Sequence, residues 1–123
     1  MTVTVSTKYR GTKEFLLVYS ELIQAARRRG TVTYKGVAEL MGLPLTGNYM
    51  GAETGHLLGE ISEDEHCHGR PMLSAIAVST SGMPGPGFFV LARSLGKLAD
   101  TSGDPERRFW ENEREAVYAA WQK

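Results

Sequence analysis

One stretch of the sequence, residues 30–89, constrains the fold more than any other part of the chain. It opens with the β-branched piece Thr31-Val32-Thr33, which predicts a short strand. Thr33 is also placed to cap a helix over residues 34–41, and Gly42-Leu43-Pro44 ends that helix. A second helix is predicted over residues 55–65, so the stretch contains two helices joined by a turn that carries glycine and proline.

A strand and a glycine-rich loop follow the two helices. The apolar run 72–78 lies between Pro71 and a Ser-Thr-Ser-Gly turn, which predicts a strand. Residues 83–87 alternate proline and glycine, so we expect an ordered loop or wing tip there and no helix. A strand, two helices, a second strand and such a loop occur in this order in winged helix-turn-helix domains. The sequence therefore predicts an α+β fold of that type with a small β-sheet.

Further helices are predicted on both sides of this stretch. Thr12 is a suitable cap for a first helix, which ends in Arg27-Arg28-Arg29 and is stopped by Gly30. Residues 88–95 return to helical spacing. After a linker, Pro105 opens a last amphipathic helix with the aromatic residues Phe109, Trp110, Tyr118 and Trp121. We expect residues 1–123 to form one domain with additional N- and C-terminal helices, and residues 1–10 to be a frayed end.

The charge balance and the single cysteine limit the class of protein. The chain has 14 Lys+Arg and 14 Asp+Glu residues, which argues against a strongly basic coat protein for nucleic acid, although local patches can still bind phosphate. Cys67 has no partner for a disulfide within the chain, which favours a reducing compartment. No signal-peptide core and no run of ~20 apolar residues is present. We expect a soluble, cytoplasmic protein with no membrane partner and no cofactor.

Four segments resemble one family. Gly30-Thr-Val-Thr-Tyr-Lys-Gly-Val-Ala38 resembles the start of the DNA-binding winged helix in the alkylguanine-DNA alkyltransferases and their alkyltransferase-like relatives, whose pattern there is Gly-x-Val-x-Ser/Thr-Tyr-Gly-x-Ile-Ala. His56-Leu-Leu-Gly59 stands where that family has Arg-Ala-Val-Gly, and Pro71-Met-Leu-Ser-Ala75 where it has Pro-Cys-His-Arg-Val. Ser81-Gly-Met-Pro-Gly85 lies at its glycine-rich wing turn. The resemblance covers about half of the chain.

The departures from the family pattern decide what the resemblance implies. Met72 stands at the position of the nucleophilic cysteine, and a thioether forms no thiolate, so alkyl transfer by that route is excluded. Alkyltransferase-like relatives also lack the cysteine and bind altered bases without repairing them, so the resemblance still implies DNA binding. His56 replaces the family's base-displacing arginine, which weakens the case for base flipping. Tyr34 matches the family, and the resemblance implies that it contacts the DNA backbone.

The residues themselves also offer a nucleic-acid surface. Arg27-Arg28-Arg29 with Lys35 is the densest positive patch and can bind phosphates, although a solvated helix end is the simpler interpretation. For Tyr34 the simpler interpretation is a partly buried ring with a locally satisfied hydroxyl. If the acidic segment of residues 60–65 faced the duplex it would repel it, so only the first turns of the second helix, residues 48–56, are expected to approach bases. The predicted contact residues are Arg27, Arg28, Arg29, Tyr34, Lys35, Asn48, Tyr49, His56, Arg70, Ser79 and Ser81.

Two other functions are consistent with the sequence. The first is a protein–protein adaptor, with a protein partner or a homodimer formed through Trp110 and Trp121; packing of this aromatic stripe on the first helix is the simpler interpretation. The second is a small metal-dependent hydrolase, for which the weak ligand candidates are His56, Glu60, His66 and His68. Their spacing matches no known metal signature. The first hypothesis remains a DNA-binding protein that performs no catalysis.

Overall fold

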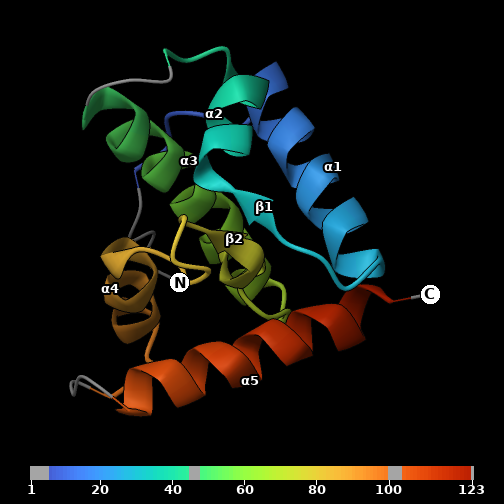
Figure 1. Cartoon of the computed structure of the whole chain (residues 1–123), viewed down its shortest axis with the longest axis vertical. Coiled ribbons are helices and arrows are strands. Elements are labelled where there is room, and N and C mark those ends of the chain that lie inside the picture. Colours follow the sequence, from blue (N-terminus) through green and yellow to red (C-terminus); the bar gives the residue numbers. More distant parts are fainter. Residues whose placement is uncertain (1–5, 45–47, 100–103, 123) are drawn as a thin grey trace.

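The computed structural model describes residues 6–44, 48–99 and 104–122, which form a mostly helical α+β structure (Figure 1). Over this part of the chain, five α-helices surround a parallel sheet of two short strands. The elements, in order, are α1 (Lys13–Arg27), β1 (Val32–Thr33), α2 (Tyr34–Met41), α3 (Asn48–Cys67), a 3-10 turn (Leu73–Ile76), β2 (Ala77–Val78), α4 (Pro86–Ser94) and α5 (Asp104–Trp121). None of the helices in these residues is long and apolar enough to cross a membrane.

Side-chain caps set the starts of α1 and α2, as the sequence predicts. The hydroxyl oxygen of Thr12 accepts a hydrogen bond from the Phe15 N–H at 3.2 Å, and that of Thr33 accepts one from the Gly36 N–H at 3.0 Å. α2 ends at Gly42, which has the left-handed conformation that favours glycine. The end of α1 differs from the prediction, because the left-handed residue there is Arg29, with φ of 56°, and not Gly30.

The predicted strand over residues 72–78 is wrong in extent. Only Ala77 and Val78 pair with β1, and residues 73–76 form the 3-10 turn. Side chains of the neighbouring helices bind the backbone of this segment in place of a second strand. Ser62 of α3 accepts the Ser74 N–H at 3.0 Å, and Trp110 of α5 donates its indole N–H to the Ala75 carbonyl at 2.9 Å. Apolar residues therefore enter the core here without forming a long ladder.

Two helix boundaries also differ from the predictions. α3 runs from Asn48 to Cys67 and is longer than the predicted helix over residues 55–65. α4 begins at Pro86, inside the segment 83–87 that was expected to contain no helix. Proline is well suited to the first turn of a helix, because its missing N–H would have no partner there. The glycine-rich loop therefore ends at Gly85, and the residues after it form one wall of the site described below.

The core lies where α1, α3 and α5 meet the 3-10 turn. Its largest fully buried apolar side chains come from all four of these segments, from the residue before the turn and from α2: Val18, Leu22, Val37, Leu57, Ile61, Met72, Leu73, Ile76 and Val117. α5 crosses one end of the molecule, and the chain between β2 and α5 folds back through α4 on the side opposite α1 (Figure 1). Trp110 of α5 is buried against this core, which accounts for the aromatic stripe within one chain. A dimer formed through Trp110 and Trp121 remains a prediction.

Candidate functional site: an apolar pocket beside Tyr34

A pocket of about 450 Å³ lies between the start of α2, the first half of α3 and the start of α4. These three segments, far apart in the sequence, enclose it together with Ser74 of the 3-10 turn. The residues that line it are Tyr34, Gly51, Thr54, Gly55, Leu58, Gly59, Ser74, Gly85, Pro86, Gly87, Phe88, Val90 and Leu91. Its volume lies in the range of small-molecule sites, and its walls are mostly apolar, as such sites usually are.

Tyr34 joins the start of α2 to the loop before α4. Its hydroxyl oxygen accepts a hydrogen bond from the Gly85 N–H at 2.5 Å, and its ring packs against the Gly85 backbone. A Cβ atom at Gly85 would lie 3.5 Å from this hydroxyl, an ordinary van der Waals contact, so Tyr34 and Gly85 are close neighbours without glycine being required there. Burial raises the pKa of Tyr34, against the opposing effect of the Gly85 hydrogen bond. The hydroxyl is thus held in place and remains protonated at neutral pH.

The wall that α3 contributes is formed largely by backbone. Gly51, Gly55 and Gly59 are spaced four residues apart and lie on one face of the helix, with Thr54 and Leu58 beside them. A Cβ atom added to Gly51 or Gly55 would meet no atom within 4 Å. These two glycines are therefore not required by packing against another part of the described chain. They leave a flat helix surface exposed to the pocket.

Ser74 lines the pocket and is only 6% exposed. The Ser62 hydroxyl donates to its Oγ at 2.7 Å, while the Ser74 N–H donates to the Ser62 Oγ at 3.0 Å. Apart from Tyr34, no ionisable side chain is among the described residues that line the pocket. The site is therefore an apolar, uncharged cavity with a few hydroxyl groups.

The acidic segment of α3 is engaged inside the protein: Glu60, Glu63 and Glu65 are buried and Asp64 is partly buried, so the segment does not form an acidic surface that would repel DNA. The Glu60 carboxylate is fully buried and accepts the backbone N–H groups of Lys8, Tyr9 and Arg10 at 2.9–3.2 Å. The Arg10 guanidinium donates to Glu63 at 2.9 Å and also binds Asp64. Residues 8–10, expected to be part of a frayed end, are thus bound to α3, whereas residues 1–5 lie outside the described part.

Glu65 completes this buried acidic set through different partners. Arg70 donates two hydrogen bonds to its carboxylate, at 2.7 and 3.0 Å, and the Tyr19 hydroxyl donates a third at 2.6 Å. Burial, together with the Glu65 carboxylate, raises the pKa of Tyr19 to about 12. The hydrogen bonds to Glu65 hold the pKa of Arg70 above its ordinary value. Arg70, a predicted DNA contact, therefore has an ion-pair partner inside the protein.

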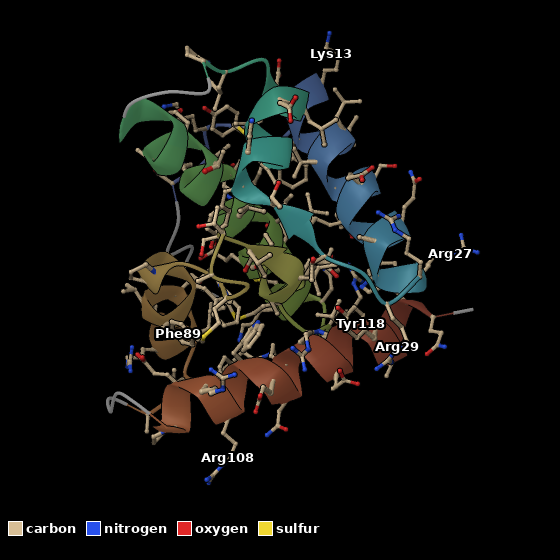
Figure 2. All side chains as sticks on the ribbon, in the orientation of Figure 1. Lys13, Arg27, Arg29, Phe89, Arg108 and Tyr118 are labelled. Atoms are coloured by element: carbon tan, nitrogen blue, oxygen red, sulfur yellow. The ribbon has the colours of Figure 1, made fainter. Side chains whose placement is uncertain are left out.

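The structure separates the three arginines from the pocket. Figure 2 shows Arg27 and Arg29 at the end of α1, with Arg29 beside Tyr118 of α5 and on the side of the molecule away from Phe89 of α4. The Arg29 guanidinium binds Glu115 at 2.7 Å and lies 4.8 Å from the centre of the Tyr118 ring. Arg28 lies 3.7 Å from the Glu21 carboxylate. Lys35, in contrast, is exposed directly beside Tyr34.

The remaining predicted contacts lie at the edges of this region. His56 of α3 contacts the N-terminal segment and not the pocket: its Nε2 lies 2.8 Å from the Ser6 carbonyl and 3.4 Å from the Glu60 carboxylate. Ser79 and Ser81 share a hydrogen bond of 2.8 Å in the exposed turn after β2. Asn48 and Tyr49 belong to the first turn of α3, but their side chains lie outside the described part of the structure.

The metal-ligand candidates find no support in the geometry. Over residues 6–44, 48–99 and 104–122, no three His, Cys, Asp or Glu side chains are grouped so that they could hold a metal ion. His68 instead lies with its Nδ1 2.8 Å from the Asp64 carbonyl. Met72 is fully buried and does not line the pocket, and Cys67 is exposed at the far end of α3.

The sequence marked parts of two pocket walls as ranges, residues 48–56 and the loop 83–87, but few individual lining residues. Of the residues predicted as contacts, only Tyr34 lines the pocket, while Ser74 and the apolar side chains of α4 had no assigned role. The four-residue spacing of Gly51, Gly55 and Gly59 is a signal that could have located one wall. Comparisons with protein-family models, with curated proteins and with solved structures found no match. The function is therefore inferred from the geometry and chemistry of the site.

Proposed function

We propose that this chain is a nucleic-acid-binding domain of winged helix-turn-helix type that performs no catalysis, and that its pocket receives a base displaced from the stack. One observation carries the proposal. The three segments that the sequence marks as the nucleic-acid face are Tyr34, the first half of α3 and the loop before α4, and all three border the same pocket. The resemblance described above supports the same assignment.

The walls of the pocket suit a flat ring. A displaced base loses its stacking with its neighbours, and proteins commonly replace that contact with aromatic and apolar side chains. Here the glycine face of α3 provides a flat wall, while Tyr34 and Phe88 provide rings. The described lining residues include no thiol, imidazole, carboxylate or amine. This set of side chains favours binding over covalent chemistry on the base.

Contacts with phosphates are expected to be few. Lys35 is exposed next to Tyr34, and no ion pair of Lys35 is found in the described part of the chain. The hydroxyl groups of Ser79 and Ser81 lie in an exposed turn. Arg28 and Arg29 already have acidic partners, so we assign them no primary role. Neutralising one or two phosphates predicts a shallow salt dependence, with a slope of roughly −1 to −2 in a plot of log affinity against log salt concentration.

A salt titration of binding tests the proposal. The probes are a fluorescent duplex with a purine opposite an abasic site, the fully paired duplex and a single strand. We expect the duplex with the unpaired purine to bind most tightly, and Lys35→Ala to reduce the salt slope by about 0.9. Lys13→Ala, at the exposed start of α1, is the matched control, because Lys13 does not line the pocket and Figure 2 shows it on the other side of the molecule from Phe89 of α4. The proposal fails if no probe binds at low salt, or if both substitutions have the same effect.

The rival function, a protein–protein adaptor, is favoured by a different observation. Leu16 and Leu17 on α1 are 64% and 42% exposed, which is unusual for large apolar side chains. This surface lies on α1, whereas the pocket lies between α2, α3 and α4. A partner that binds there would lose affinity on replacement of Leu16 and Leu17 by Ser and would be insensitive to changes in the pocket.

A further inference from the structure

The hydrogen bonds of Ser74 leave one of its donors unused. Its Oγ accepts the Ser62 hydroxyl hydrogen at 2.7 Å, so the hydrogen on Ser74 itself must point elsewhere. No acceptor for it is found over residues 6–44, 48–99 and 104–122. The side chain is only 6% exposed and lines the pocket. A buried donor without a partner is costly, so an acceptor atom inside the pocket would be stabilised there.

Tyr34 has the same unused donor. Its hydroxyl oxygen accepts the Gly85 N–H at 2.5 Å, and its own hydrogen has no acceptor in the described part of the chain. Thr54, the third hydroxyl, donates to the Gly51 carbonyl at 3.2 Å. Two hydroxyl groups that line one cavity thus each accept one hydrogen bond from the protein and have a hydrogen left to donate. The pocket is equipped to bind acceptors.

The surrounding residues also determine the charge of the ligand. The described lining residues provide neither a cation nor an anion at neutral pH, so a charged group would lose its hydration without gaining a counter-charge. We infer that the pocket selects a flat, neutral heteroaromatic ring that presents a hydrogen-bond acceptor, and no charge, to the hydroxyl groups of Ser74 and Tyr34. The inference deepens the proposed function, because it concerns the pocket assigned to a displaced base.

Small probe molecules test the chemistry of the pocket independently of nucleic acid. Quinoline and isoquinoline have a neutral ring with an acceptor nitrogen at two different positions, whereas naphthalene has the same shape and no acceptor. N-methylquinolinium keeps the shape but carries a positive charge. Amide chemical-shift titration of the whole chain gives each affinity. We expect one of the two neutral heterocycles to bind about 3- to 10-fold more tightly than naphthalene, the worth of one hydrogen bond, and the cation to bind weakest.

Substitutions assign this preference to Ser74. In Ser74→Ala the preference for the heterocycle over naphthalene should disappear, while naphthalene affinity, which also reports that the pocket is folded, is retained. Ser20→Ala, an exposed serine on α1, is the matched control and should change neither affinity. If Ser74→Ala does not fold, Tyr34→Phe serves instead and should reduce the same preference. Equal affinity of the wild type for all three neutral probes, or tighter binding of the cation, would overturn the inference.

The duplex with an unpaired purine separates this inference from the proposed function. Probe binding that depends on Ser74, with no duplex binding at low salt, would leave the inference intact and reject the nucleic-acid function. Duplex binding together with equal affinities for quinoline, isoquinoline and naphthalene would do the reverse. The two sources of the ring, a free small molecule and a nucleobase in a strand, are thereby distinguished.

Discussion

Filling the pocket from the glycine face of α3 should stabilise the protein and abolish its binding. Gly55 lies in the interior of a 20-residue helix and lines the pocket, and a Cβ atom added there meets nothing within 4 Å. Replacing a helix-interior glycine by alanine or leucine is worth about 1 kcal/mol of helix propensity. For a chain of this size, that gain raises Tm by roughly 3–6 °C. Gly55→Leu also places a branched side chain where the ring of the ligand would lie.

The assay combines calorimetry with the quinoline titration and the duplex titration described above. Gly55→Ala should give most of the rise in Tm with a small loss of affinity. Gly55→Leu should give the rise in Tm together with at least a tenfold loss of affinity. Ala52→Leu is the matched control, since Ala52 is exposed on the same helix and does not line the pocket. It should change neither Tm nor affinity. Wild-type affinity in Gly55→Leu would show that the pocket is not the binding site, and a lower Tm would show that its Cβ position is not open.

Three further predictions concern stability. Arg10→Met leaves buried carboxylates without their cation and should lower the free energy of unfolding in urea by about 3–5 kcal/mol; a loss below 1 kcal/mol would contradict this role. Trp110→Phe leaves the Ala75 carbonyl without its donor and should lower the free energy of unfolding by about 1–3 kcal/mol, as measured by calorimetry. Trp121→Phe should lower it less, because the Trp121 indole N–H is buried without a partner in the described residues. The pKa of Tyr19 is about 12 in the folded state and ordinarily 10, so its contribution to stability is complete below pH 10 and is lost as pH rises towards 12. In urea unfolding between pH 10 and 12, the free energy of unfolding should fall less steeply with pH in Tyr19→Phe than in the wild type, and equal slopes would refute this.

Local signals in the sequence predicted the helices well, because each depends on a few adjacent residues. Thr12 and Thr33 cap helices through their own hydroxyl groups, and Gly42 ends α2 through its own backbone conformation. The strand over residues 72–78 was wrong in extent for the opposite reason. The partners that hold Ser74 and Ala75 are 12 and 35 residues away, on α3 and α5. A local apolar run does not reveal whether a strand or a side chain will bind its backbone.

The burial of the acidic segment shows the same limit. Nothing in the local sequence indicates that Glu60 and Glu63 are buried, because a run of acidic residues normally lies in solvent. Their compensating groups are the backbone and side chain of Arg10, about fifty residues earlier in the sequence, in a segment that was expected to be frayed. The contact between α3 and residues 8–10 therefore explains both why Glu60 and Glu63 are buried and why residues 8–10 are bound to the helix. The pocket was missed for a related reason, since its walls come from α2, α3 and α4 and no single segment contains its pattern.

α3 joins these two features, and their energetics favour an external occupant of the pocket. Gly51, Gly55 and Gly59 each cost about 1 kcal/mol in a helix interior relative to alanine, on the order of 3 kcal/mol together. At Gly51 and Gly55 nothing in the described chain occupies the space that a side chain would fill, so packing does not explain the cost. The buried carboxylate of Glu60 and its partners hold another face of the helix in place and offset part of it. The helix α3 is thus held in place through Glu60 on one face and carries no side chain at Gly51 and Gly55 on the face that lines the pocket. Proteins typically depart from local sequence preferences at binding sites, so this departure favours a ligand in the pocket.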